Sequence, residues 1–156
     1  IKDILKYRKG VFVMLVKNCA GALTFWSDKV FLLKDERGEW VFPKTVIKTE
    51  ELPGDAALRA LKDNAGITAE IVSTAGHVSY EISSKINYQP IYNKIIWYVM
   101  ISQKQEILIN EEKGFTEGGY FTLEEAMSLI THSCHKAILN LLSREGIEVV
   151  SELVIA

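Results

Sequence analysis

The sequence has little of what marks membrane, secreted or disordered proteins. Its 156 residues include two cysteines and three prolines, and 18 Lys and Arg are nearly balanced by 20 Asp and Glu. The longest apolar runs, 11–16 and 95–101, are far shorter than the ~20 residues that a helix needs to cross a bilayer. The small net charge of −2 gives no general attraction to polyanions. We therefore expect no membrane and no nucleic acid among the partners.

The cysteines and the overall composition indicate one globular domain in a reducing compartment. Two cysteines cannot build a disulfide framework, and Cys19 and Cys134 lie in different apolar settings that suit buried free thiols. The numbered chain shows no signal-peptide pattern, so a cytoplasmic location is expected. The apolar fraction of 48% and the charged fraction of 24% are ordinary for a globular chain, and the length predicts a single domain over residues 1–156.

Short apolar segments separated by turn residues predict a strand-rich chain. Lys17-Asn18 separates the first two apolar runs, so we expect consecutive hairpins in this region. Residues 91–101 are apolar on both faces, which is typical of a central strand. The expected strands are 11–16, 20–26, 30–33, 40–42, 71–80, 91–101 and 120–121. The tail 147–156 and residues 1–18 could add strands or form the face of a homodimer.

Apolar residues at helical spacing predict three helices. The first runs from Pro53, which suits a first helical turn, to Gly66, which suits a helix stop. The second follows a capping box formed by Thr122 and Glu125, and the third covers 133–142. Strands on both sides of a central helix, with two helices at the end, indicate a mixed sheet packed between helices.

A motif over residues 40–67 carries the functional information. With Gly66 taken as its late glycine, this stretch resembles the Nudix box, G-x5-E-x7-R-E-U-x-E-E-x-G-U, in which U is apolar. The first glutamate of the pattern falls on Glu51 and its arginine on Arg59, with the spacing of the family. The lead-in at 40–44 resembles the W-x-x-P-K of Nudix enzymes that act on diadenosine polyphosphates and diphosphoinositol polyphosphates.

The resemblance, which spans about residues 19–142, implies the Nudix α/β/α sandwich. In that fold a mixed β-sheet lies between the box helix on one side and the C-terminal helices on the other. The resemblance also implies Mg²⁺ or Mn²⁺ as cofactor and a nucleotide or another phosphoanhydride small molecule as ligand. Glu51, Arg59 and Gly66 then have structural roles, with a salt bridge from Glu51 to Arg59 joining loop and helix. A phosphate contact through Arg59 is the alternative.

The chain departs from the box at the residues that hold the metal ions in the family. The opening glycine is Thr45, the glutamate after the arginine is Ala60, and the next glutamate pair is Asp63 and Asn64. In the family these helix carboxylates converge because positions i, i+3 and i+4 share a helix face. Here Asp63 alone remains as a metal ligand, and it is one methylene shorter than glutamate. We therefore expect the metal affinity to be lower by orders of magnitude.

Other side chains could contribute to a ligand site. Lys44 and Lys48 flank the expected cleft and could contact phosphate as point charges, and solvated loop lysines are the alternative. Among the aromatic residues, Tyr88 or Tyr92 could touch a ligand, because the stretch 87–93 resembles a loop.

Two further groups of residues could carry chemistry. Glu111, Glu112 and Glu117 lie in a region similar to the one from which Nudix members draw a further acid, so Glu112 or Glu117 could act as a catalytic base. The segment 132–135 contains two histidines and a cysteine, which are residue types that bind zinc, but no fourth ligand is near in sequence. Helix-capping and first-turn roles are the simpler interpretation of this segment.

The sequence leaves two functions open. The first is a Nudix-like domain with a degenerate active site, which has lost most or all phosphoanhydride hydrolysis and retains nucleotide-type ligand binding or an interaction role. The second is an active Mg²⁺- or Mn²⁺-dependent Nudix hydrolase of nucleoside diphosphates linked to another group, which uses Asp63 with loop glutamates. Fold alone cannot choose between the two.

Overall fold

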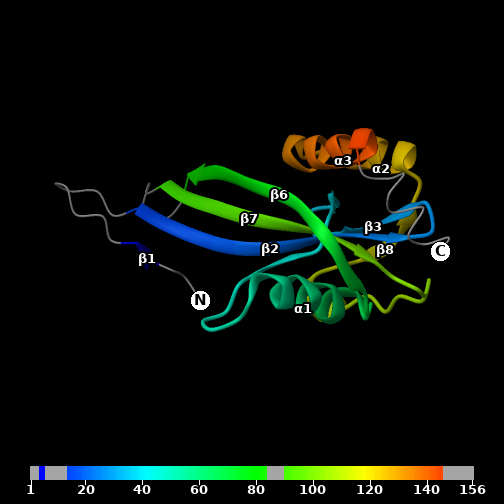
Figure 1. The fold of residues 1–156 in the computed structure, drawn as a ribbon, viewed down its shortest axis with the longest axis horizontal. Coiled ribbons are helices and arrows are strands. Elements are labelled where there is room, and N and C mark those ends of the chain that lie inside the picture. The colour runs from blue at the N-terminus through cyan, green and yellow to red at the C-terminus, as the bar shows by residue number, and fades with distance from the viewer. Residues whose placement is uncertain (1–3, 6–13, 84–89, 146–156) are drawn as a thin grey trace.

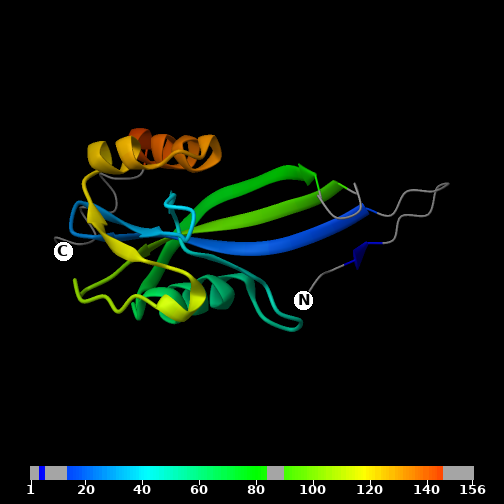
Figure 2. The same ribbon diagram turned by 180° about the vertical axis from the view of Figure 1, so that it is seen from behind.

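The computed structural model describes residues 4–5, 14–83 and 90–145, which form three layers. A mixed β-sheet lies in the middle, and helix α1 (Pro53–Ala65) lies against one face. Helices α2 (Leu123–Leu129) and α3 (Ser133–Glu145) lie against the other face, as Figure 1 and, from behind, Figure 2 show. The predicted fold class, a mixed sheet between one helix and a pair of C-terminal helices, is confirmed.

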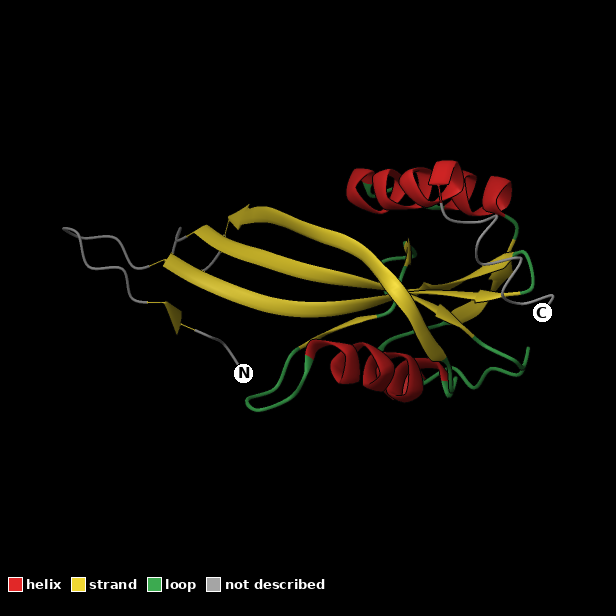
Figure 3. Cartoon of the chain, in the orientation of Figure 1, coloured by secondary structure: helices red, strands yellow, loops and turns green. Residues whose placement is uncertain are grey.

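The sheet is built around strands β2 and β7, which run parallel to each other. The strand order is β4-β3-β2-β7-β6, while β1 and β5 also pair with β2, and β8 pairs with β3. The strands are β1 (Ile4–Leu5), β2 (Met14–Trp26), β3 (Lys29–Lys34), β4 (Trp40–Val41), β5 (Lys44–Val46), β6 (Glu70–Ser83), β7 (Pro90–Ile101) and β8 (Glu117–Phe121). Long strands extend together beyond the helices, as Figure 3 shows. These strands are β2, β6 and β7.

Strand β2 is continuous across Lys17 and Asn18, so the turn expected at these residues is wrong. In the register with β7, Lys17 lies beside Asn93, and Asn18 lies beside Lys94. Each of these polar residues therefore has a polar neighbour on β7. The strand continues through them, although the sequence of β2 alone indicates a break. The strand β5 was not expected, and the other described strands lie near their predicted positions.

Some predicted features lie wholly or partly outside the described residues. Within the first 18 residues, Ile4–Leu5 form β1, which pairs antiparallel with β2. The expected strand residues 11–13, the tail 147–156 and Tyr88 lie outside the described residues. No helix in the described ranges has the length and apolar character needed to span a bilayer.

The sheet divides the interior into two apolar clusters. On the α1 side, Leu61 packs with a cluster that includes Phe31 and Met100. On the other side, Trp97 and Phe42 pack with residues of α2 and α3. Each helix layer therefore covers one apolar face of the sheet.

Gly21 of β2 is required by the close approach of Trp97 from β7. A Cβ atom on Gly21 would lie 2.3 Å from Cζ3 of Trp97, so the indole ring fills the space above the glycine. Trp97 is 1% exposed and makes an edge contact with Phe42 at a ring-centroid distance of 5.8 Å. The absence of a side chain at Gly21 thus allows the largest core residue to lie against the backbone.

Both predicted ends of α1 and the predicted start of α2 are confirmed. Pro53 opens α1, and Gly66 closes it in the left-handed conformation, with φ of 64° and its N–H donating to carbonyls of the last turn. Oγ1 of Thr122 accepts the backbone N–H of Glu125 over 3.2 Å, and the Glu125 carboxylate accepts the N–H of Thr122 over 3.3 Å. This reciprocal pair is the capping box at the start of α2.

The two cysteines differ in their surroundings. Cys19 is buried in β2, and this burial raises the pKa of its thiol. Cys134 lies in the first turn of α3 and is half-buried. The expectation of two buried thiols therefore holds for Cys19 and is wrong for Cys134, because the start of α3 faces a pocket rather than the core.

Candidate functional site

The loop before α1 is held to the helix by an ion pair between Arg59 and Glu51. The guanidinium donates from Nε to Oε2 and from Nη2 to Oε1 of Glu51, each over 2.9 Å. Nη2 also donates to the Val46 carbonyl over 2.9 Å, and Oε1 of Glu51 accepts the N–H of Lys48 over 3.0 Å. The hydrogen bonds from Arg59 lower the pKa of the Glu51 carboxyl to about 2. This is the loop-to-helix salt bridge that the sequence indicated.

Arg59 directs its donors at this loop. Its Nη1 lies 3.5 Å from Oγ1 of Thr45, and its side chain is 22% exposed. A phosphate contact by Arg59 would therefore compete with the contacts that hold the loop.

Thr45, at the opening position of the box, lies in strand β5 and pairs with Ala20 of β2. β-Branched residues suit this extended backbone, so the threonine is accommodated without strain. Within the described residues, positive φ at non-glycine residues occurs at Ser27 and at Glu50, where φ is 67°. The loop therefore changes direction at Glu50 rather than at Thr45.

The end of α1 presents one carboxylate at the surface. Ala60 and Asn64 are buried, at 1% and 6% exposure, whereas the side chain of Asp63 is 43% exposed. Nζ of Lys113 lies 3.9 Å from Oδ2 of Asp63 and forms an ion pair with it. Of the three helix positions, Asp63 alone therefore presents a carboxylate at the surface, and the cation beside it is an ammonium group.

Backbone hydrogen bonds fix the position of Lys113. The N–H groups of Leu108 and Asn110, together with Nδ2 of Asn110, donate to the last carbonyls of α1 over 2.8 to 2.9 Å. A helix leaves these carbonyls open at its C-terminus, so the bonds satisfy groups that need partners. The next residues form the 3-10 turn η1 (Glu111–Lys113), which this attachment places beside Asp63.

The loop glutamates lie in two different places. Glu111 and Glu112 line a pocket of about 470 Å³ together with Asp63, which we call the Asp63 pocket. Glu117 lies in β8, where it pairs with Lys34 over 3.6 Å. Across the ranges that the structure describes, no three His, Cys, Asp or Glu side chains are arranged to hold one metal ion. Glu112 and Asp63 therefore line one pocket without forming a metal-binding group, and Glu117 lies apart from them.

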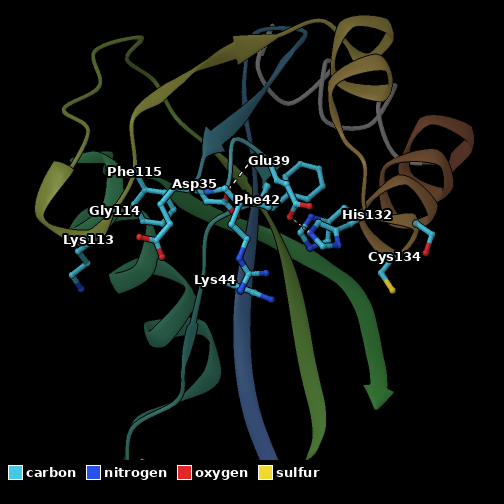
Figure 4. A pocket seen from close by; sticks show the side chains of 14 residues that line it. Asp35, Glu39, Phe42, Lys44, Lys113, Gly114, Phe115, His132 and Cys134 are labelled. Atoms are coloured by element: carbon cyan, nitrogen blue, oxygen red, sulfur yellow. Dashed lines mark hydrogen bonds and ion pairs between the residues drawn. The ribbon is translucent and has the colours of Figure 1, made fainter. Parts of the chain in front are cut away.

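A second pocket, of about 590 Å³, surrounds Lys44, and we call it the Lys44 pocket. It lies between the turn after β3, the start of α3 and the loop after η1. Figure 4 shows Lys113 and His132 on opposite sides of Lys44. The charged residues of its lining are Asp35, Glu36, Glu39, Arg37, Lys44 and Lys113.

Two acidic side chains of this lining are bonded within the wall. Oδ1 of Asp35 accepts the N–H groups of Arg37 and Glu39 over 2.9 and 3.0 Å. Oε2 of Glu39 lies 2.8 Å from Nε2 of His132, which joins the turn after β3 to the start of α3. The His132 carbonyl also accepts the N–H of Lys136, so His132 lies at the N-terminal end of α3, directly before its first turn. Sequence spacing gave no signal for the contact with Glu39.

His135 is a neutral ring in the deep wall of the Lys44 pocket. It is 5% exposed and packs against Phe42 and Trp97 at ring-centroid distances of 5.4 and 5.3 Å. Burial, with smaller effects of Lys44 and His132, lowers its pKa to about 3. Its Nδ1 has no hydrogen-bond partner among the described residues. Because a buried polar atom without a partner is unfavourable, His135 is suited to bond a water or a ligand.

Tyr92 does not lie in a loop, as the sequence suggested, but within β7. Its position is roughly 16 Å along the strand from Trp97, which lies beside the β2 residue that pairs with Lys44. The structure therefore does not bring Tyr92 to the Lys44 pocket. The loop-like stretch 87–93 overlapped the expected strand 91–101, and the structure has β7 beginning at Pro90, close to the expected start of that strand.

Comparisons with known proteins identify the family. A family model for the NUDIX domain matches residues 6–142. The chain belongs to the NUDIX domain family. The resemblance found in the sequence spans about residues 19–142. The family model begins earlier, at residue 6, and also ends at residue 142.

Solved Nudix structures share the fold of this chain. An Ap4A hydrolase from C. elegans is 18% identical, with a TM-score of 0.63 over 82% of this chain and 96% of that chain. The NUDIX domain of NrtR from Shewanella oneidensis, complexed with ADP ribose, is 14% identical, with a TM-score of 0.66 over 82% and 86%. A MutT protein from Methanosarcina mazei Go1 is 18% identical, with a TM-score of 0.65 over 83% and 94%.

The Nudix box of this chain fits a divalent cation poorly. Mg²⁺ requires nearly octahedral oxygen ligands and is usually held by one or two carboxylates with substrate phosphates. Of the helix positions that hold metal in the family, Asp63 alone carries a carboxylate, and it is paired with Lys113. The donor set at the end of α1 therefore does not match a resident Mg²⁺ or Mn²⁺. Sequence reasoning did not single out Lys113, because its place beside α1 depends on the contacts of Leu108 and Asn110.

Proposed function

We propose that this Nudix domain binds a nucleotide-type small molecule with a diphosphate group in the Lys44 pocket and hydrolyses it weakly or not at all. The observation that carries the proposal is the end of α1, where Asp63 is the one carboxylate at the metal positions of the family. The structural half of the box is retained, since Arg59 and Glu51 still hold the loop. The metal-binding half is not retained.

The missing carboxylates have a large energetic effect. At an effective dielectric constant near 20, a carboxylate ~4 Å from a unit charge contributes about 4 kcal/mol before desolvation, and more toward a dication. A loss of only ~1.4 kcal/mol already weakens binding tenfold. In metal-dependent hydrolysis the cation neutralises the charge that develops on the phosphate. Low metal affinity therefore supports weak or absent turnover.

The Lys44 pocket suits a ligand with both a charged and a flat part. Its volume of about 590 Å³ lies within the range of ~300–1,000 Å³ that is usual for ligand sites. Lys44 supplies positive charge, Phe42 and Phe115 supply aromatic surface, and His135 supplies a neutral hydrogen-bonding ring. Of the structures with this fold, one is an Ap4A hydrolase and one is complexed with ADP ribose, and both compounds are nucleotides with phosphoanhydride bonds.

Binding and turnover measured on one sample test the proposal. The purified chain is titrated with ADP, ADP-ribose and Ap4A by calorimetry, and product formation is followed by chromatography against a blank that contains metal and ligand alone. We expect saturable binding of at least one ligand and no turnover above the blank. Turnover at the rate of ordinary enzymes that Asp63→Ala abolishes would refute the proposal.

Two lysine variants locate the ligand. Lys44→Met should weaken binding by about tenfold, because a charge-assisted contact to phosphate is lost. Lys62→Met is the matched control, since Lys62 is an exposed lysine that contacts Thr68 and does not line the Lys44 pocket. Equal losses in both variants would indicate nonspecific attraction and would argue against this pocket.

An active hydrolase is the second candidate, favoured by the Asp63 pocket. Asp63, Glu111 and Glu112 line this pocket, so a substrate phosphate could complete a metal site there. This candidate predicts Mn²⁺-dependent turnover that Glu112→Gln reduces strongly, because a positioned base contributes about 10²- to 10⁴-fold. Glu117→Gln serves as its comparison, because Glu117 is engaged with Lys34 in β8. No metal binding near Asp63 in the presence of a nonhydrolysable nucleotide would exclude this candidate.

A further inference from the structure

Lys113 connects the Lys44 pocket with Asp63 at the end of α1. It ends the turn η1, it lines the Lys44 pocket, and its Nζ pairs with Asp63 over 3.9 Å. The Lys113 and Asp63 side chains are 49% and 43% exposed, so water screens this ion pair and holds it weakly. The ammonium group can therefore exchange the Asp63 carboxylate for another anion at small cost.

The Lys113 ammonium group lies beside Asp63, which occupies a metal-binding position of the Nudix box. In the Nudix family this helix position carries a carboxylate that holds a divalent cation, and in this chain it faces a lysine. Asp63, Glu111 and Glu112 are opposed by Lys62 and Lys113, so the net charge of this region is about −1, which attracts a dication only weakly. A dication would also be repelled by the Lys113 ammonium that lies beside its single ligand.

We propose that Lys113 supplies the positive charge that a divalent cation supplies in metal-dependent Nudix enzymes, so that a diphosphate ligand binds in the Lys44 pocket without metal. The inference rests on the proposed function and names how its ligand is held. An ammonium group has three donors and acts as a compact point charge toward phosphate oxygens. To reach a diphosphate beside Lys44, the Lys113 ammonium group would leave Asp63 and turn into the Lys44 pocket.

The acidic residues of the lining limit this attraction only in part. The carboxylates of Asp35 and Glu39 already accept hydrogen bonds within the pocket wall. The Glu36 side chain lies beside Gly114, in the loop after η1. A Cβ atom added to Gly114 would lie 3.3 Å from Oε2 of Glu36. Its charge opposes an anionic ligand, so Glu36→Gln should tighten diphosphate binding.

The test is calorimetry with ADP as probe, once in EDTA and once in Mg²⁺. We expect the wild-type dissociation constant to change by less than about threefold between the two conditions. Lys113→Met should weaken binding in EDTA by about tenfold or more, because a charge-assisted bond to phosphate is lost. Lys62→Met, which changes a lysine next to Asp63 in sequence but outside the Lys44 pocket, should bind like the wild type. Thermal unfolding of each variant establishes that it is folded.

Asp63→Asn separates the two roles of the site. If Lys113 holds the phosphate, removal of its carboxylate partner frees the ammonium group and tightens ADP binding in EDTA. If Asp63 holds a metal, the same change weakens binding in Mg²⁺. Binding that requires Mg²⁺, or Lys113→Met with wild-type affinity, would overturn this inference and leave the proposed function in place. If none of ADP, ADP-ribose and Ap4A binds under either condition, the proposed function fails and the inference fails with it.

Discussion

Replacement of Glu51 by glutamine tests how strongly the retained half of the box stabilises the fold. The substitution keeps the shape of the side chain and removes the charge that faces Arg59. The guanidinium then keeps its bond to the Val46 carbonyl but loses its counter-ion, while its side chain is 22% exposed. The structure therefore predicts a loss of stability without a change of fold.

The magnitude follows from the geometry of the pair. Exposed ion pairs contribute about 0–1 kcal/mol, whereas breaking a buried pair costs about 3–5 kcal/mol. The Arg59 and Glu51 side chains are 22% and 17% exposed and share two bonds of 2.9 Å, which places them between these limits. We expect Glu51→Gln to lower the free energy of unfolding by about 2 kcal/mol. In a domain of this length that shift lowers Tm by about 4–8 °C.

The effect must depend on pH in a defined direction. Arg59 lowers the pKa of Glu51 from 4.5 to about 2 in the folded state. The stability that the ionised carboxylate adds is therefore fully present above pH 4.5 and is lost as the pH falls toward 2. The difference in unfolding free energy between wild type and Glu51→Gln should be constant from pH 7 to pH 5 and shrink between pH 4.5 and pH 2.

Urea unfolding at several pH values measures this difference. Glu50→Gln is the matched control, since it removes the neighbouring, exposed glutamate and should change stability little. A Glu51→Gln protein as stable as the wild type at pH 7 would refute the reasoning. A stability difference that stays constant down to pH 2.5 would refute it as well, because the loss would then not arise from the charge.

Three further predictions concern the core, a helix cap and the pocket. Gly21→Ala should lower the free energy of unfolding by about 2 kcal/mol in denaturant titrations, because its methyl group would overlap the Trp97 ring. Thr122→Ala should cost about 1 kcal/mol in the same assay, because α2 loses its N-terminal cap. The ring of His135 should show no titration by NMR between pH 5 and pH 8, because burial lowers its pKa to about 3. A midpoint near pH 6.5 would contradict the buried position of the ring.

The fold was predictable where local sequence patterns agree with the tertiary structure. Pro53, Gly66 and the Thr122–Glu125 capping box mark helix ends through short-range hydrogen bonds and backbone preferences, so the sequence locates them directly. The prediction of a break in the strand at Lys17 was wrong, because the polar neighbour of Lys17 is Asn93 of β7, which is distant in sequence. Tyr92 was misplaced because the loop-like stretch 87–93 overlapped the expected strand 91–101, and the structure has Tyr92 in that strand, paired with Glu81 of β6.

The site was predictable only as far as the box motif reaches. The Arg59–Glu51 pair follows from motif spacing, and it is present in the structure. Lys113 and Glu39 were not found, because each acquires its role from a contact with a residue distant in sequence. Lys113 reaches Asp63 through the attachment of the preceding loop to α1, and Glu39 reaches His132 across the Lys44 pocket. Single-sequence patterns carry no signal for such pairs.

The parallel pairing of β2 with β7 sets the order in which the chain can mature on the ribosome. Residues 15–25 pair with residues 91–101, so the centre of the sheet forms only after α1 and β6 have been synthesised. At ~5–20 residues per second, β2 waits roughly 4 to 15 s for its partner after it is complete. During this interval one long edge of β2 offers unpaired backbone groups to other chains. This exposed edge is therefore a site at which aggregation can begin during synthesis.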